Sequence, residues 1–212
     1  MYGSVFFVKK LIIVLVSFMF ILFFASCITN NEIDEMKRID EISNRYNLKT
    51  IKKDEIPKNI IPIKVENSFE LEYLLKEISK TNLNKSNVRF ELTNKLTTKG
   101  YTSYYTAKFS KKITKNNLNI ANIYFNVMAD LKIFKDGSFG EILSYSNERC
   151  SLTGWTLAAK LEYPKASVEI SSDKQSATLR GSGTVNLYLL IQNLIKLYSY
   201  DVSVSGTYKI NY

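Results

Sequence analysis

Apolar residues follow two different spacings along this chain, and the change comes near residue 86. Before it, the clearest run recurs every three or four residues: Phe69, Leu71, Leu74, Leu75 and Ile78. That spacing places these residues on one face of a helix. Asn67 or Ser68 stands at the position of a helix cap, and Glu70 lies in the first turn. The pattern predicts an amphipathic helix that packs on the core.

After residue 86, apolar and polar residues alternate. In the longest run, from Ala121 to Ile133, Ile123, Phe125 and Val127 alternate with polar neighbours. A period of two over a dozen residues predicts a long strand with one buried face. Similar runs occupy 88–92, 101–109, 155–163, 166–170, 177–181 and 198–212, and a return strand begins near 139. We predict a mainly β (α+β) fold, with one N-terminal helix followed by about eight antiparallel strands in a sandwich or a curved barrel-like sheet.

Glycine, proline and polar clusters suggest where these strands end. Asp136-Gly137 predicts a two-residue hairpin, because glycine accepts positive φ. Pro164 is expected to end the strand over 155–163, and 171–175 is a polar turn that contains the formal Ser-x-x-Lys match, Ser171 to Lys174. The stretch 186–196 fits a strand or a helix. We prefer a strand, because 181–184 fits a strand or bulge that continues into it.

The start of the chain has the layout of a secretory signal peptide. Lys9 and Lys10 precede an apolar run from Leu11 to Phe24, which is short of the about 20 residues of a membrane-spanning helix. The following Ala25-Ser26-Cys27 resembles a bacterial lipobox. This resemblance implies that residues 1–26 are cleaved and that Cys27 carries a thioether-linked diacylglycerol, often with an N-linked acyl chain such as palmitate. Two or more acyl chains anchor a protein stably to a membrane.

The mature chain divides by composition into two parts. Residues 27–58 are polar, and we predict a lipidated tether there, although Ile33, Met36, Ile39 and Ile42 also have the spacing of a short amphipathic helix. Residues 59–212 are predicted to form a single β-rich domain. Residues 181–186 (GSGTVN) and 197–206 (LYSYDVSVSG) faintly resemble small exported lipoproteins of Bacteroidetes with unassigned function. We expect a lipid-anchored protein of the cell envelope, with the outer membrane favoured.

Several kinds of catalysis are excluded by composition. The chain has no histidine, which rules out Ser-His-Asp and Cys-His catalysis and histidine-ligated zinc. Lipidation of Cys27 leaves only Cys150, so neither a disulfide framework nor a cysteine-based metal site is available, and Cys150 is expected to act as a small buried apolar residue. A glycosidase would need two converging carboxylates, but nothing in the sequence brings together the strand acids Glu141, Glu148, Glu162 and Glu169. We predict no enzyme, no cofactor and no metal.

Charge and tyrosine content point to binding. The net charge is +9, and loss of Lys9 and Lys10 lowers it to +7. Arginine is scarce and the lysines are scattered, so nucleic acid is not a predicted partner, whereas anionic lipid or glycan stays open.

Tyrosines offer the candidate contact residues. Among the 14 tyrosines, Tyr104, Tyr124 and Tyr188 fall on the polar phase of their strands and form a candidate surface for glycan or protein. The alternative is that tyrosine merely suits pleated surfaces, and Trp155 is expected in the core. We predict a non-catalytic, membrane-anchored exported lipoprotein that acts in binding or envelope structure. The alternative is a β-rich carrier with a pocket for a small apolar ligand.

Overall fold

The computed structural model describes residues 32–83, 88–99, 102–114, 122–136 and 139–210, without the side chains of 82–83 and 94–99. Cys27, the signal peptide and Gly137 lie outside the described residues. The fold is mainly β, as predicted. A helix over residues 32–45 comes first, and the following elements are β1 (Lys49–Ile51), the 3-10 helix η1 (Lys53–Glu55), β2 (Ile63–Val65), α2 (Ser68–Leu83), β3 (Val88–Lys99), β4 (Thr102–Lys112), β5 (Ile123–Asp136), β6 (Phe139–Gly154), β7 (Ala159–Ile170), β8 (Ser176–Ile191) and β9 (Leu194–Lys209).

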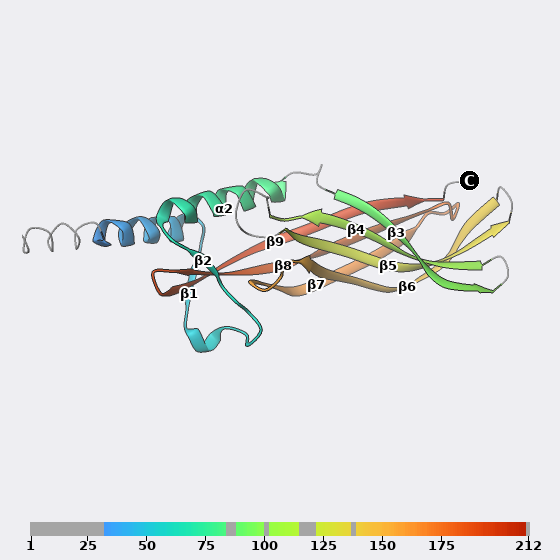
Figure 1. Ribbon diagram of the computed structural model, residues 1–212. Helices are drawn as coiled ribbons and strands as arrows, with labels where there is room; N and C mark the ends of the chain where they lie inside the picture. Colours follow the sequence, from blue (N-terminus) through green and yellow to red (C-terminus); the bar gives the residue numbers. More distant parts are fainter. Residues whose placement is uncertain (1–31, 84–87, 100–101, 115–121, 137–138, 211–212) are drawn as a thin grey trace, which may run out of the picture.

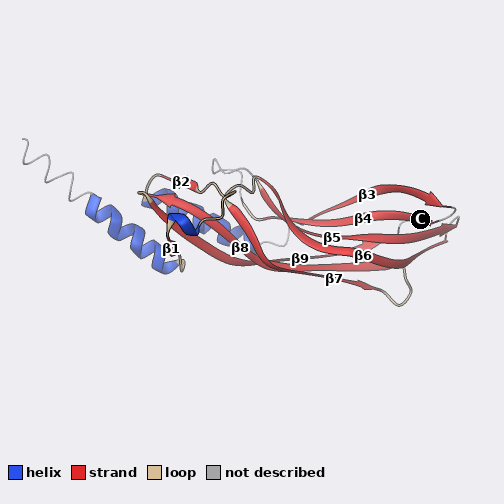
Figure 2. Ribbon diagram, turned by 90° about the horizontal axis from the view of Figure 1, so that it is seen from below, coloured by secondary structure: helices blue, strands red, loops and turns tan. Residues whose placement is uncertain are grey.

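The strands form two sheets that lie face to face (Figure 1). The first sheet has the order β3-β4-β5-β6, and the second has the order β1-β9-β8-β2, with β7 also paired to β8. All pairs are antiparallel except β2 with β8. The strands β8 and β9 have 16 residues each and run almost the full length of the molecule (Figure 2). The predicted sandwich is therefore confirmed, and the structure is two sheets rather than one curved sheet.

The inner faces of the sheets follow the alternation in the sequence. In β5 the side chains of Ile123, Phe125 and Val127 are fully buried, and in β8 so are Val185 and Leu187. The apolar side chains of the two inner faces form one buried core. Burial of this apolar surface is the main stabilising contribution in such a sandwich.

Glycine lets the two sheets approach closely. A Cβ on Gly206 would lie 2.0 Å from the Cδ1 atom of Phe109, and one on Gly181 would lie 2.7 Å from the Cβ of Val127. Both glycines thus provide space for a side chain of the opposite sheet.

At the end of the molecule where β1 and β2 lie, helices rather than strands of the first sheet cover the second sheet. Leu71, Leu74 and Ile78 of α2, together with Ile39 and Ile42 of the helix over 32–45, belong to the buried core. The amphipathic spacing at 33–42 therefore forms a helix that packs on the domain. Instead of the tether expected over 27–58, residues 39–51 are folded against the domain, because this helix buries its apolar face and β1 pairs with β9.

The predicted helix over 69–78 is confirmed as α2, and its first turn is capped by two groups. Asn67 Oδ1 accepts a hydrogen bond from the Glu70 N–H at 2.9 Å, as the sequence predicted for an N-cap. The Glu35 carboxylate accepts hydrogen bonds from both the backbone N–H and the hydroxyl of Ser68. These contacts tie the helix over 32–45 to the start of α2.

Three predicted strand limits need correction or completion. The run over 155–163 begins only at Ala159, because residues 155–158 form the turn between β6 and β7. Pro164 does not end β7: Tyr163 adopts a φ of 51°, and a bulge between Glu162 and Lys165 lets the strand continue. The ambiguous stretch 186–196 is strand, interrupted by the turn Gln192-Asn193 with φ of 46° and 64°, as in a type I′ hairpin.

The other two turn predictions have different outcomes. Asp136 is the last residue of β5 and pairs with Phe139 of β6, so it is not part of a two-residue turn with Gly137, which lies outside the described residues. The formal Ser-x-x-Lys match lies in a turn, where Ser171 donates a hydrogen bond to Asp173. These residues therefore form a turn and do not begin a helix.

Candidate functional site

The three tyrosines singled out from the sequence lie in three different environments. Tyr104 lies on the outer face of β4, 40% exposed, with the Lys132 ammonium 6.0 Å from the ring centroid. Tyr124 is half-buried on the same face of β5. Tyr188 belongs to the second sheet and is only 5% exposed, and burial raises the pKa of its hydroxyl. The structure therefore removes Tyr188 from any surface shared with the other two.

Tyr104 and Tyr124 share a sheet face but are far apart along it. Tyr104 stands opposite Lys132 of β5, whereas Tyr124 stands opposite Lys112 at the other end of β4. Lys132 and Tyr124 are eight positions apart on β5, which corresponds to about 27 Å along a strand. A single small ligand therefore cannot contact both rings.

The other candidate groups from the sequence are occupied structurally. Cys150 is half-buried against the core, and burial raises the pKa of its thiol, which favours the poorly nucleophilic protonated form. Glu141, Glu162 and Glu169 form separate ion pairs with Lys174, Lys160 and Arg180, and Glu148 is exposed on β6. Within the described ranges, no group of three or more acidic or cysteine side chains could hold a metal ion. No helix among the described residues is long and apolar enough to cross a membrane.

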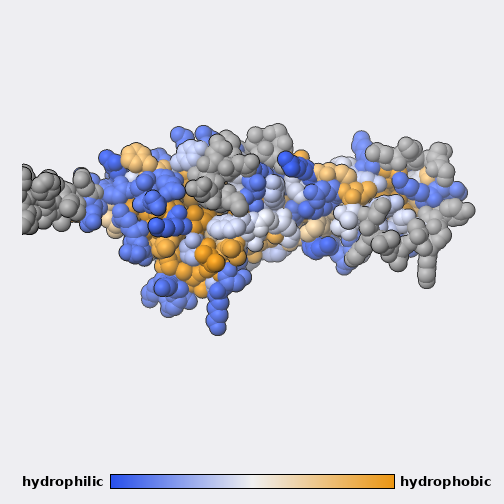
Figure 3. Space-filling model, viewed as in Figure 1, coloured by the Kyte–Doolittle hydropathy of each residue, from blue (hydrophilic) through white to orange (hydrophobic). Residues whose placement is uncertain are grey.

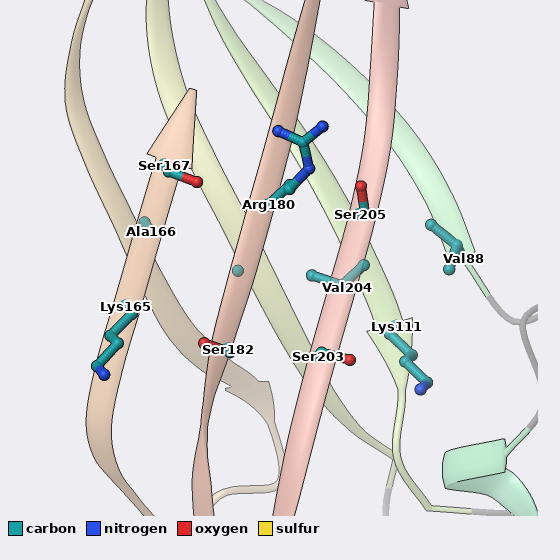
Figure 4. A pocket seen from close by; sticks show the side chains of 11 residues that line it. Val88, Lys111, Lys165, Ala166, Ser167, Arg180, Ser182, Ser203, Val204 and Ser205 are labelled. Atoms are coloured by element: carbon teal, nitrogen blue, oxygen red, sulfur yellow. The ribbon is translucent and has the colours of Figure 1, made fainter. Parts of the chain in front are cut away.

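A pocket of about 810 Å³ lies on the outer face of β7, β8 and β9 (Figure 4). Its floor consists of two neighbouring rows of residues, and each row runs across β7, β8 and β9. One row is Ser167, Arg180 and Ser205, and the other is Lys165, Ser182 and Ser203. We call these six residues and the space above them the hydroxyl pocket.

The hydroxyl pocket extends around the edge of β9 to the first sheet. Val88 of β3 and Lys111 of β4 complete its lining (Figure 4). Burial lowers the pKa of the Lys111 ammonium group, because desolvation disfavours the charged form. An anion nearby would offset that effect by stabilising the charge.

The pocket combines cationic and hydroxyl side chains with the apolar Val88, Ala166 and Val204. Its lining includes Lys111, Lys165, Arg180 and four serines, and among the described residues that line it none carries a carboxylate. Arg180 donates a hydrogen bond of 2.7 Å to Glu169, which lies beside the pocket. That pair is exposed and is therefore weak, and the planar guanidinium has further N–H donors for a ligand.

A second, smaller pocket continues along the same sheet face. It has a volume of about 370 Å³, shares Lys165, Ser182 and Ser203 with the hydroxyl pocket, and adds Tyr163 and Asp201. Tyr163 lies at the β7 bulge and is 77% exposed. Thr184 donates a hydrogen bond to Asp201 at 2.8 Å. An exposed ring therefore stands at one end of a polar surface that follows the strands.

Sequence reasoning did not identify these pocket residues, although their pattern was visible. Ser203 and Ser205 alternate with the buried Val202 and Val204, so they are the solvent phase of a predicted strand. The signal that would have located the pocket is the recurrence of serine on the same phase of three strands. Their alignment depends on strand register and on the β7 bulge, which alternation alone does not fix.

Comparisons with known proteins give no assignment for this chain. No family model, no curated protein and no solved structure matches it. A functional conclusion therefore depends on the sequence and the geometry described above.

Proposed function

We propose that this chain is a membrane-anchored, non-catalytic exported protein that binds an acidic glycan in the hydroxyl pocket. One observation carries the proposal: three cationic side chains and four serine hydroxyls line a single open pocket. Ammonium and guanidinium groups recognise carboxylate or sulfate groups. Serine hydroxyls both donate and accept hydrogen bonds, so they suit the hydroxyl groups of a sugar.

The extended shape of the surface supports a chain-like ligand. Rows of outward-facing residues follow one another along the strands at intervals of about 7 Å. The smaller pocket adds a further row, in which Thr184 stands opposite Asp201. Tyr163 provides a ring at the end of these rows, and aromatic rings can supply binding contacts at small entropic cost. An acidic polysaccharide lying along the strands would contact Arg180 and Lys165 with one part of its length and the Tyr163 ring with the next part.

Binding is tested by removing the two exposed cations of the pocket. Lys165→Ala with Arg180→Ala should weaken the affinity of the full lipidated chain for a polyuronate by at least about tenfold, since each lost charge-assisted hydrogen bond costs about 1.5–3 kcal/mol. Titration calorimetry at low and high salt measures this. The residual affinity of the native chain should fall with salt.

A matched variant separates the pocket from general charge. Lys135→Ala with Arg149→Ala removes the same two residue types from exposed positions of the first sheet and should leave affinity unchanged. Equal losses in the two variants, or preference for a neutral glycan over the polyuronate, would contradict the proposed pocket.

The anchoring part of the proposal rests on the Ala-Ser-Cys motif at 25–27. Labelled palmitate should be incorporated into the native chain and not into Cys27→Ala. Incorporation that persists in the variant would contradict the lipobox interpretation and would not affect the pocket proposal. The alternative, a carrier for a small apolar ligand, gains no support from the two pockets, because both are open and have polar side chains.

A further inference from the structure

We propose that the free edge of β9 accepts an extended polypeptide strand of another protein, which completes the second sheet. The strand would have apolar side chains at alternate positions. It would lie beside β9 from about Ser199 to Lys209 and under the inner face of β3. This site lies along the edge of β9, whereas the floor of the hydroxyl pocket lies on the outer face of the sheet. The two sites meet at Val88 and Lys111, which line the pocket beside that edge.

The first observation is an empty position beside β9. β1 pairs with β9 only opposite Ile195 to Leu197, and no other described strand pairs with that edge. The chain leaves this position because Asn47 adopts a φ of 54° and leads back to the helix over 32–45. β1 thus shows that a strand fits against this edge, and most of the edge lies beyond it.

The second observation is exposed apolar surface on the inner face of β3. Phe90 and Leu92 stand opposite Phe109 and Ala107 of β4. Those two β4 residues are 5% and 0% exposed, whereas Phe90 and Leu92 are 43% and 39% exposed. Figure 3 shows apolar surface where Figure 1 places the start of β3. Phe90 and Leu92 are therefore on the core-facing side of β3 but are not covered by the second sheet.

The layering of the sandwich explains why β3 is uncovered. β4 lies over β9, as the contact of Phe109 with Gly206 shows, so β3 overhangs the second sheet by one strand. The Phe90 ring contacts Phe109 of its own sheet, with ring centroids 4.8 Å apart, and Tyr208 at the margin of β9, with ring centroids 5.7 Å apart. In this half of the molecule, three strands of the second sheet (β7, β8 and β9) lie opposite the four strands of the first sheet.

The geometry also indicates the kind of strand. A strand added to β9 gains backbone hydrogen bonds along an unpaired edge. Side chains in phase with Val202 and Val204 would point towards Phe90 and Leu92 and should be apolar. Side chains in phase with Ser203 and Ser205 would point to solvent and should be polar. The overhang of β3 has the width of one strand, so a second copy of this sandwich, with its own β3 overhanging, would collide there.

The test uses the full lipidated chain in detergent and two synthetic ten-residue peptides. One peptide alternates valine with threonine and lysine, and the other has the same composition with its valines grouped. Hydrogen exchange measured by mass spectrometry should show slower exchange in β9 and β3 with the alternating peptide only. The affinity for that peptide should fall at least tenfold in Leu92→Asp.

Leu143→Asp is the matched control, because Leu143 is also 39% exposed but lies on β6. It should leave peptide affinity unchanged. Equal protection by the two peptides, equal loss in the two variants, or protection confined to β6 would overturn the proposal. So would protection of β9 by self-association of the chain without peptide. If Leu92→Asp fails to fold, the comparison of the two peptides on the native chain decides. Polyuronate affinity is measured separately in the absence of peptide, because Val88 and Lys111 line the hydroxyl pocket beside the same edge. Leu92→Asp leaves the cations of that pocket in place and should not change polyuronate affinity, so failure of one proposal is distinguishable from failure of the other.

Discussion

The two sheets bury similar inner faces but have very different outer faces. Inside, both present apolar residues at alternate positions, and these are buried except on β3, where Phe90 and Leu92 are 43% and 39% exposed. Outside, the first sheet presents larger groups that bind one another: Asp130 accepts hydrogen bonds from Thr106 at 2.7 Å and from Asn147 at 2.8 Å. The second sheet presents serines, and its outer face opens into the hydroxyl pocket.

This difference separates residues that specify the fold from residues available for binding. Polar groups that satisfy one another contribute to a single packed arrangement. Small hydroxyl groups that line an open pocket contribute little to stability and remain available to a ligand. We therefore expect substitutions on the inner faces to cost the most, those in the hydrogen-bonded outer cluster less, and those in the pocket or at exposed rings the least.

The largest expected effect tests whether the inner faces are equivalent. Phe125→Ala in the first sheet and Leu187→Ala in the second both truncate fully buried side chains. Each should lower the free energy of unfolding by about 3–5 kcal/mol, because the lost burial is accompanied by a cavity. Chemical denaturation measures both. A cost under about 1 kcal/mol for either would mean that the sheet concerned does not form half of the core.

The next effect concerns the close approach of the sheets at glycine. Gly206→Ala should cost about 2–3 kcal/mol, because its new Cβ meets the ring of Phe109 at 2.0 Å and the packed core must shift. Gly183→Ala is the matched control. Its Cβ would meet the Cδ1 atom of Leu161 at 2.9 Å and the backbone oxygen of Glu162 at 3.3 Å. It should cost less than Gly206→Ala, because the end of the flexible Leu161 side chain can move. Equal denaturation midpoints for the two variants would contradict the packing of β4 over β9.

The alternation in the sequence was sufficient for the strands and for their buried phase, because side-chain direction in a strand has a period of two. It identified β5 and the burial of Phe125 directly. It placed Tyr104 and Tyr124 on an outer face, but failed for Tyr188. That residue is on the outer phase of β8 and is nevertheless buried, at the end of the strand where Ala158 accepts a hydrogen bond from its backbone N–H. Burial of this kind depends on elements far apart in the sequence.

The candidate site was less predictable than the fold. Ser182 and Ser203 are neighbours only because β8 and β9 pair in one register, and Lys165 joins them only because the bulge at Tyr163 and Pro164 shifts β7. The same proline led the sequence reasoning to end the strand. Edge strands accept proline at bulges, and that option is visible only once β7 is known to be an edge.

A smaller effect distinguishes the two outer faces. Asp130→Ala should cost about 1–2 kcal/mol, since it leaves the Thr106 hydroxyl and the Asn147 amide without their carboxylate partner. Ser203→Ala should change stability by under about 0.5 kcal/mol, because its side chain is exposed in the pocket. Thermal and chemical unfolding of both variants checks the contrast. If Ser203→Ala cost as much as Asp130→Ala, the pocket serines would be structural groups and the comparison would fail.

The smallest effect concerns the two tyrosines on the outer face of the first sheet. Tyr104→Ala should change the free energy of unfolding by under about 0.5 kcal/mol, because the ring is exposed and its contact with Lys132 is at the limit of a cation–π interaction. Tyr124→Ala should cost more, because its ring is half-buried. The separation of about 27 Å along β5 means that the two changes should add in the double variant, within about 0.5 kcal/mol.

The same double variant also tests whether these rings bind the ligand. The hydroxyl pocket has its floor on the other sheet, so polyuronate affinity should be the same in the native chain and in Tyr104→Ala with Tyr124→Ala. Tyr163→Ala, which removes the ring at the end of the pocket rows, should weaken that affinity while leaving the melting temperature unchanged. If the double variant lost affinity and Tyr163→Ala did not, the ligand would lie on the first sheet. The serine-lined face of the second sheet would then be an ordinary solvated surface.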